Sequence, residues 1–317
     1  MGKLLLAAPE HMGIIEVVQE GLKKYSGHSV DFLNLLTTEK FVYKHFRQRT
    51  YNFFLKNLTG QNIKTHYYNK KFKEKIVQFG SDYDIIVIIR PDLVTNKILK
   101  LLRKKTNHFV AYYWDTAKFY PRKLKIRKYF DKIFSFDPKD CKKYGFNFLS
   151  NFYYYENAAP HIDYQVYNLS SFDYRKDLIE RIGEKLYNLN ISSCLKLAYH
   201  QPFKSDYIQH IPKVINYQVM LKEIASAQVV LEVQRKNQCG LSFRPFEALG
   251  LNKKLITTNS DIKNYDFYDE ANILILDYDA TNIEIPKAFF ETPYKPIPQS
   301  KREKYHLKNW VTTLLSR

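Results

Sequence analysis

The feature that most constrains the fold is a regular alternation of short apolar runs with longer segments of helical spacing. Residues 3–8, 84–89 and 108–114 have the length and the apolar content of buried strands. Segments such as 12–24 and 94–105 instead repeat their apolar residues with a helical period. Strands that alternate with helices predict right-handed βαβ units and parallel sheets.

The alternation pauses once and then starts again, which predicts two domains. Residues 156–161, with Ala158-Ala159-Pro160, have the composition of a linker. A chain of 317 residues is long enough for two domains of ordinary size. We therefore expect domains at 1–157 and 158–302, closed by a helix at 303–317. Further strands are expected at 28–35, 132–136, 164–170, 193–199, 228–233, 254–258 and 272–276, and further helices at 38–58, 63–78, 122–130, 173–189, 217–226, 244–251 and 303–315.

Cysteines and apolar runs indicate a cytoplasmic protein. Cys141, Cys194 and Cys239 lie far apart with no metal-type spacing, as free thiols in a reducing compartment do. The apolar run at the N-terminus is too short for a signal peptide. No stretch approaches the roughly 20 apolar residues that cross a bilayer.

Positive charge is concentrated in the first half of the chain. The net charge is +18, with 29 Lys and Arg against 13 Asp and Glu through Tyr155, and 21 against 19 from Glu156 onward. Such asymmetry predicts that the first half faces an anionic partner. Nucleic acid, an acidic membrane surface and a phosphorylated glycan all fit this charge.

One segment, residues 238–259, carries the pattern of an anion site. Gly240 and Ser242 directly precede an expected helix, and Arg244 and Glu247 fall in or near its first turn. Free backbone N–H groups at a helix start, together with an arginine, suit a diphosphate. A glutamate one turn further can accept hydrogen bonds from ribose hydroxyls. The alternative is a capped helix with Glu247 placed favourably near its positive end.

The segment also resembles a known signature. Gly-Leu-Ser-Phe-Arg-Pro-Phe-Glu-Ala-Leu-Gly at 240–250, followed by Lys-Leu-Ile-Thr-Thr-Asn at 254–259, is similar to the donor site of bacterial GT-B glycosyltransferases of lipopolysaccharide and capsule biosynthesis. A looser similarity covers the whole chain. The resemblance implies two Rossmann-like α/β domains whose parallel sheets face a central cleft. It also implies metal-independent sugar transfer, without a cofactor, from a nucleotide sugar to a glycan or lipid-linked oligosaccharide.

The resemblance assigns roles to individual residues. It implies that Glu247 holds the donor ribose and that Arg244 binds the diphosphate and assists catalysis. It also implies that the neighbouring residues line the diphosphate and the sugar; these are Gln238, Gly240, Leu241 and Ser242. Many retaining members carry a second glutamate eight positions before the ribose-binding one. Cys239 stands there, so a retaining outcome is only slightly favoured over an inverting one.

Three more residues follow expected strands and are candidates for the site. Arg175 follows the first strand of the second half and would bind diphosphate through its planar fork. His11 and Asp115 follow strands of the first half, where the resemblance to GT-B enzymes implies a general base or an acceptor contact. Each has a plain alternative as a solvated surface residue.

The basic helices of the first half suggest a membrane surface. Lys97, Lys100 and Arg103 share one expected helix, and a larger set of Lys and Arg between 40 and 75 is interleaved with Tyr and Phe. Basic helices with such aromatic residues suit an anionic bilayer interface, which predicts a peripheral protein on the cytoplasmic membrane. A nucleic-acid-binding protein is the main rival, although no such signature is present and we expect no nucleic-acid partner. A nucleotide-sugar-binding protein without catalysis is the other. Asp277-Tyr-Asp279 has the spacing of a metal-binding pair, but a turn is expected there, and no metal site is predicted.

Overall fold

The computed structural model describes residues 2–36, 41–59, 61–156, 159, 161–236 and 238–316. The chain divides into two compact units. The first comprises Met1–His11, Ile15–Ser135 and Leu314–Arg317, and the second comprises Met12–Ile14 and Phe136–Thr313. Residues 157, 158 and 160 of the expected linker, and residues 38–40 of the expected helix 38–58, lie outside the described residues.

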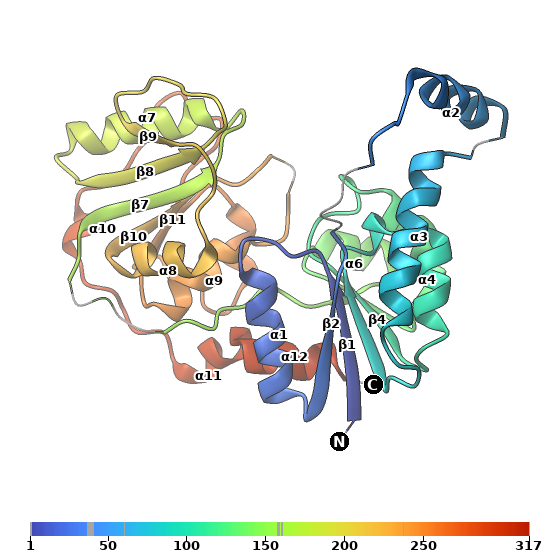
Figure 1. The fold of residues 1–317 in the computed structure, drawn as a ribbon. Helices are drawn as coiled ribbons and strands as arrows, with labels where there is room; N and C mark the ends of the chain where they lie inside the picture. The colour runs from blue at the N-terminus through green and yellow to red at the C-terminus, as the bar shows by residue number, and fades with distance from the viewer. Residues whose placement is uncertain are drawn as a thin grey trace. The chain divides into compact units, whose positions relative to one another are not determined.

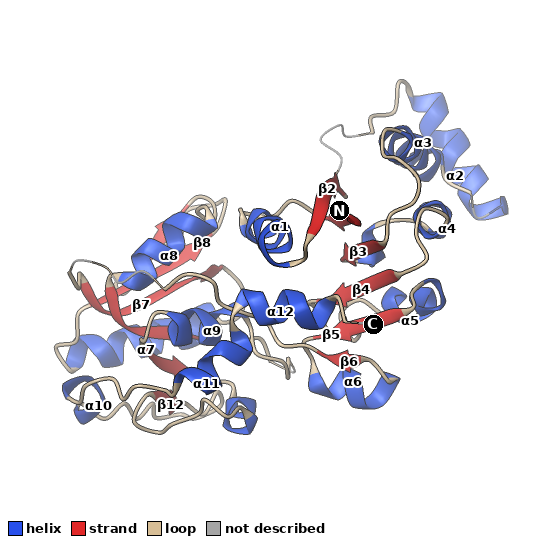
Figure 2. Cartoon of the chain, turned by 90° about the horizontal axis from the view of Figure 1, so that it is seen from below, coloured by secondary structure: helices blue, strands red, loops and turns tan. Residues whose placement is uncertain are grey.

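The first sheet is built from short strands in the order β2-β1-β3-β4-β5-β6 (Figures 1 and 2). Its strands are β1 (Gly2–Ala8), β2 (His28–Asn34), β3 (Ile85–Ile89), β4 (Phe109–Tyr113), β5 (Lys132–Ser135) and β6 (Asn147–Phe148). The ladders that join β1 to β5 are parallel. Every residue of β3 and β4 is buried, which explains their continuous apolar sequence.

Helices cover the two faces of this sheet. Helix α1 (Ile14–Tyr25) lies on one face, and α4 (Asn96–Arg103) and α5 (Arg122–Ile126) lie on the other (Figure 2). Helix α3 (Ile63–Val77) packs beside α4. Helix α2 (Phe46–Thr59) lies beyond α3 and away from the strands of its sheet in both views (Figures 1 and 2).

The second sheet repeats the plan in the order β12-β11-β10-β7-β8-β9. Its strands are β7 (Tyr164–Ser171), β8 (Ser193–Ala198), β9 (Ile208–Ile211), β10 (Ala227–Glu232), β11 (Lys254–Thr257) and β12 (Ile273–Ile275). Every neighbouring pair is parallel. Helices α7 (Lys176–Asn188) and α10 (Ala288–Glu291) share one apolar core with the sheet. Helices α8 (Tyr217–Ala225) and α9 (Phe243–Gly250) pack against β10 from the other face (Figure 1).

The remaining described elements are short. They are η1 (Pro91–Leu93), η2 (Arg127–Tyr129), α6 (Pro138–Tyr144), η3 (Ser260–Asn264), α11 (Gln299–Arg302), η4 (Glu303–Tyr305) and α12 (Leu307–Leu314). No helix within the described residues is both long enough and apolar enough to span a bilayer.

The expected elements are largely present, although the short elements β6, α10 and α11 were not expected. Three further differences concern longer segments or a sheet edge. The described part of the expected helix 38–58 is helical only from Phe46. The expected closing helix is interrupted at His306, whose backbone is extended, so that η4 and α12 are separate. Strand β9 was not expected at all, because Ile-Gln-His-Ile is short and lies at the sheet edge.

Each strand order has one reversal, and this position matters for function. In the first sheet the chain runs from β1 outward to β2 and then returns to β3 on the other side. In the second sheet it runs from β7 to β8 and β9 and returns to β10. Ligands of open parallel sheets bind beyond the carboxyl ends of the strands at such a reversal. Ligand sites are therefore expected at the edges beyond β1 and β3 and beyond β7 and β10.

Candidate functional site

In the second unit, the carboxyl ends of β10 and β11 meet the start of α9 through a buried carboxylate. Ser242 is the N-cap of α9, and its Oγ accepts a hydrogen bond from the Arg244 backbone N–H at 3.2 Å. The same hydroxyl donates to the Glu232 carboxylate at the end of β10. Thr257, the last residue of β11, donates to Glu232 Oε2 at 2.8 Å. The helix start is thus fixed against two strand ends.

Glu247 and Arg244 form a buried ion pair one turn apart on α9. The Glu247 side chain is 1% exposed and that of Arg244 is 16% exposed. Arg244 Nη2 also donates to the Leu169 carbonyl at 3.0 Å and lies 2.8 Å from Met220 Sδ. The guanidinium of Arg244 is therefore occupied by groups of its own unit. In this arrangement it orients Glu247, whereas the sequence assigned it to a diphosphate.

Several polar atoms around Glu247 have unused hydrogen-bonding capacity. Among the described residues, Glu247 Oε1 and the Tyr217 hydroxyl are buried, and neither makes a hydrogen bond of ordinary geometry. The two groups are close enough for the Glu247 carboxylate to influence the Tyr217 hydroxyl. Burial raises the pKa of Tyr217 well above its usual value, and the adjacent Glu247 carboxylate adds to the shift. Gln234 Oε1 and Asn259 Nδ2, beyond β10 and β11, are likewise buried and unpaired within the described chain. Buried polar atoms rarely stay unpaired, so these are candidates for ligand contacts.

We call the group formed by Tyr217, Glu232, Ser242, Arg244 and Glu247 the α9 cluster. It combines the N-terminus of a helix, which attracts anions, with a carboxylate that can accept from hydroxyls. A nucleotide offers both chemistries, because it carries phosphates and a ribose diol. The sequence analysis named three of these residues and missed Tyr217 and Glu232. Glu232 closes a strand directly before the motif, which is the signal that could have found it.

Gly240 and Leu241 have packing roles in the structure. A Cβ on Gly240 would lie 2.4 Å from the Phe136 carbonyl oxygen, so only glycine fits there. Leu241 is 1% exposed, and its carbonyl accepts from Asn151 Nδ2 at 2.9 Å. Gln238 is half-buried, and its Nε2 lies 3.4 Å from the Gly240 carbonyl. Of these three residues, Gln238 alone has a polar side chain that can bind a ligand.

Arg175 is held by its own neighbours, and a different arginine is more open. Its Nε and Nη2 donate to the two oxygens of Asp173 at 2.8 and 2.9 Å, and its Nη1 donates to the Val233 carbonyl at 2.9 Å. Arg235 follows β10, lies 3.5 Å from Asp173 and keeps half of its side chain exposed. Arg235, which the sequence analysis did not name, is therefore the better placed cation at this edge.

In the first unit, the edge beyond β3 and β4 carries a charged network centred on Arg90. Arg90 Nη1 donates to Asp115 Oδ2 at 3.0 Å, and its Nη2 donates to Asp92 Oδ2 at 2.9 Å. The guanidinium also stacks 4.1 Å above the Tyr120 ring. Arg90 has a positive φ of 60°, a strained conformation for a residue with a side chain. Such strain is common at functional positions.

His11 belongs to the same electrostatic network. The His11 side chain is exposed to solvent. Desolvation by the surrounding protein atoms still lowers the pKa of His11 below 6.5, Asp115 opposes this shift, and Arg90 adds to it. The imidazole is therefore neutral at pH 7 and able to accept a proton. We call His11, Arg90, Asp92 and Asp115 the β3 edge cluster. The structure thus places His11 and Asp115 in one electrostatic network, to which Arg90 and Asp92 also belong.

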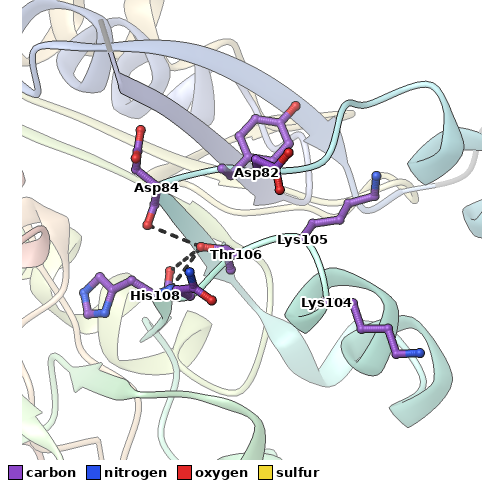
Figure 3. A pocket seen from close by; sticks show the side chains of 8 residues that line it. Asp82, Asp84, Lys104, Lys105, Thr106 and His108 are labelled. Atoms are coloured by element: carbon purple, nitrogen blue, oxygen red, sulfur yellow. Dashed lines mark hydrogen bonds between the residues drawn. The ribbon is translucent and has the colours of Figure 1, made fainter.

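A hollow of about 490 Å³ lies at the opposite edge of the first sheet (Figure 3). It is lined by residues that precede β3 and β4, including Asp82, Asp84, Lys104 and Lys105. Thr106 Oγ1 bonds the Asp84 and His108 carbonyls at 3.3 and 3.2 Å, and Lys105 Nζ donates to two more carbonyls. These groups serve the turn itself, and the amino ends of parallel strands are not where ligands bind.

Metal ligands do not gather in the described part of the chain, where no three His, Cys, Asp or Glu side chains are grouped to hold an ion. The predicted turn at Asp277–Asp279 is present, since the Asp279 N–H donates to Asp277 Oδ1 at 3.0 Å.

No family model matches the sequence, and no curated protein sequence matches it. Solved structures do match over nearly the whole chain. An α-glucosyltransferase bound to UDP and a 13-mer DNA has 12% identity and a TM-score of 0.58, over 99% of this chain and 95% of that one. A UDP-forming trehalose-phosphate synthase from Burkholderia xenovorans has 12% identity and a TM-score of 0.56, over 99% and 98%. A glycosyltransferase of avilamycin A biosynthesis has 10% identity and a TM-score of 0.54, over 99% and 96%.

These similarities establish the fold. The neighbours are GT-B proteins, and the two six-stranded parallel sheets with flanking helices match that class. The expectation of a GT-B fold with two Rossmann-like α/β domains is confirmed.

Proposed function

We propose that this protein is a glycosyltransferase that takes its sugar from a nucleotide-sugar donor. The observation that carries the proposal is the α9 cluster, a helix start and an incompletely bonded carboxylate at the reversal point of a GT-B sheet. Several structural neighbours are described as UDP or UDP-glucose complexes, which favours UDP as the nucleotide.

Two sets of groups bind the donor, one at its ribose and the other at its diphosphate. Glu247 accepts from the ribose hydroxyls, and Tyr217 donates to the same part of the nucleotide once side-chain rotation opens the buried cluster. The diphosphate lies at the start of α9, where Ser242 and the backbone N–H groups face it and Arg235 supplies a cation. Arg244 positions Glu247. Stabilising the departing diphosphate contributes several kcal/mol in the transition state of such reactions.

We further propose an envelope glycan as acceptor, either lipopolysaccharide, capsular polysaccharide or a lipid-linked oligosaccharide, in the cytoplasm. The supporting features are the resemblance of residues 240–259 to enzymes of those pathways and the positive first half of the chain. His11 and Asp115 would contact this acceptor. A retaining outcome is preferred, since one neighbour is a trehalose-6-phosphate synthase described as transferring with retention.

Nucleic acid stays a second candidate acceptor. Two neighbours are α-glucosyltransferases in complex with DNA, and the first half of this chain is strongly basic. The expectation that nucleic acid is not a partner therefore loses its support. The other alternative is a protein that binds nucleotide sugars without turnover. It is distinguished from a transferase acting on either acceptor because it forms no glycosylated product.

The test is acceptor-dependent release of UDP. The purified protein is incubated with a panel of UDP-sugars and, in separate reactions, with envelope glycolipid or double-stranded DNA. We expect UDP release only with glycolipid, and labelled sugar in that fraction. UDP release only with DNA would show that nucleic acid is the acceptor. Tight UDP binding without UDP release from any UDP-sugar would show that the protein binds nucleotide sugars without turnover.

A further inference from the structure

Helix α2 presents an exposed apolar face on its outer side. The face is formed by Phe46, Tyr51, Phe53, Phe54 and Leu58, each between 54% and 81% exposed. At 100° per residue these positions fall within about 160° of the helix circumference. The same arc also holds the exposed residues Arg47, Thr50 and Asn57. Soluble surfaces rarely gather so many large apolar side chains, and such patches mark interaction sites.

The inner side of α2 is fixed to its own unit. Asn52 is the buried residue of the helix, its Nδ2 donates to the Tyr43 hydroxyl at 2.8 Å, and its Oδ1 accepts from the Ile63 N–H at 2.7 Å. These bonds hold α2 at the start of α3 and direct the apolar face outward. In Figures 1 and 2 the helix lies farther from its sheet than α3 does.

The apolar face is surrounded by uncompensated positive charge. Residues 41–77 contain nine Lys and Arg and a single acid, Glu74. Arg47, Arg49 and Lys56 of α2 pair with no acidic side chain in the part of the chain that the structure describes. By contrast, Arg103 of α4 is bound to Asp131 at 2.6 and 3.0 Å, and Lys105 is bound to carbonyls.

We propose that α2 docks on the surface of an anionic lipid bilayer, with its apolar face in the headgroup region. An interfacial helix needs an apolar face together with flanking cations that attract acidic lipids, and α2 has both. A nucleic-acid partner would account for the cations and for the aromatic rings, on which bases can stack. It would gain nothing from Leu58, which is 81% exposed. The sequence predicted a membrane surface from the basic residues of α4 together with those between 40 and 75, and the present proposal places the docking element at α2.

The experiment measures flotation of the whole protein with vesicles, without donor or acceptor, so that its outcome is separate from the proposed enzymatic function. Vesicles are phosphatidylcholine alone or mixed with phosphatidylglycerol. Wild type is expected to float with the acidic vesicles and to lose this binding as salt rises. Phe53→Ser/Phe54→Ser/Leu58→Ser is expected to weaken binding at least about tenfold. Arg47→Glu/Arg49→Glu/Lys56→Glu should weaken it as well.

Two matched controls keep the proposal open to contradiction. Tyr187→Ser/Val219→Ser removes exposed apolar side chains of the second unit, and Lys97→Glu/Lys100→Glu/Lys104→Glu reverses charges on and just after α4. The first should bind acidic vesicles as wild type does, and the second should lose less than the α2 charge variant. Circular dichroism verifies that all variants are folded.

Three results would overturn the proposal. The first is equal flotation by wild type and the Phe53/Phe54/Leu58 variant. The second is binding of wild type to a double-stranded oligonucleotide with none to acidic vesicles, which assigns the surface to nucleic acid. The third is a wild-type dimer in light scattering that the Phe53/Phe54/Leu58 variant abolishes, again without vesicle binding, which assigns it to a second copy of the chain.

Discussion

The two sheets carry polar clusters at equivalent edges, but the clusters are built differently. In the β3 edge cluster Arg90 is shared between Asp92 and Asp115, so the charges satisfy one another. In the α9 cluster Glu247 has one oxygen paired with Arg244 and one without a partner in the described chain. This difference fits the proposed function. The second unit has a carboxylate oxygen that can accept from the hydroxyls of a donor, and the first has a neutral imidazole that can accept a proton.

The largest expected effect comes from breaking the buried pair of the α9 cluster. Glu247→Ala leaves the Arg244 guanidinium mostly buried without its carboxylate, which typically costs about 3–5 kcal/mol. The double variant Arg244→Met/Glu247→Gln removes both charges and should recover about wild-type stability. Urea unfolding of the single and double variants measures this. A single variant as stable as wild type would show that the pair is not closed in solution.

A second change addresses the β3 edge cluster. We expect His11→Ala to lower kcat/KM for the acceptor by about ten- to a hundredfold, the effect of losing one strong hydrogen-bond partner. Because the pKa of His11 lies below 6.5, the wild-type rate should fall on the acidic side of that value as the imidazole protonates. The variant should lack this acidic limb and keep wild-type affinity for UDP. An unchanged pH profile would remove His11 from the reaction.

A smaller effect is expected at the cap of α9. Ser242→Ala removes the hydrogen bond to the Arg244 N–H and one donor to Glu232, at a cost of about 1 kcal/mol. UDP affinity should fall as well, because the cap lies where the diphosphate is proposed. Ser260 begins η3 and does not cap α9, so Ser260→Ala is the control for both measurements. Equal UDP affinity in the two variants would place the diphosphate elsewhere.

The smallest effect is a change in how stability depends on pH. Burial raises the pKa of Glu232 above 4.5, although the hydrogen bonds from Ser242 and Thr257 oppose the shift. The folded state then binds more protons than the unfolded state, so this residue's contribution to stability decreases as pH rises from 4.5 through the folded pKa. Glu232→Gln should flatten that slope in urea midpoints taken at several pH values. An identical slope would mean that Glu232 has the same pKa in the folded and unfolded states.

The sequence predicted the fold well because its signals are local. Apolar runs such as 84–89 mark buried strands, and the restart of the pattern after 156–161 marks a second sheet. It missed β9, whose pairing with β8 comes from tertiary contact. It also expected a longer helix before Phe46, because a dense set of Lys, Tyr and Phe fits a helix and a basic loop equally well.

The site was predicted in outline, and its internal contacts were not. Residues at strand ends were found, since βα connections place them at one edge. The spacing of three between Arg244 and Glu247 allows a pair on a helix, but it cannot show that both are buried. The contact of Ser242 with Glu232, ten residues earlier, and the packing of Phe136 over Gly240 arise only when distant segments meet.

The most direct test of the account is calorimetric titration of UDP into three proteins. They are wild type, Arg244→Met/Glu247→Gln, which should remain folded, and His11→Ala, which alters the other cluster. The account predicts UDP binding by wild type and His11→Ala with equal affinity, and binding at least about tenfold weaker in the double variant. Equal affinity in all three proteins, or no UDP binding by wild type, would contradict a donor site at the start of α9.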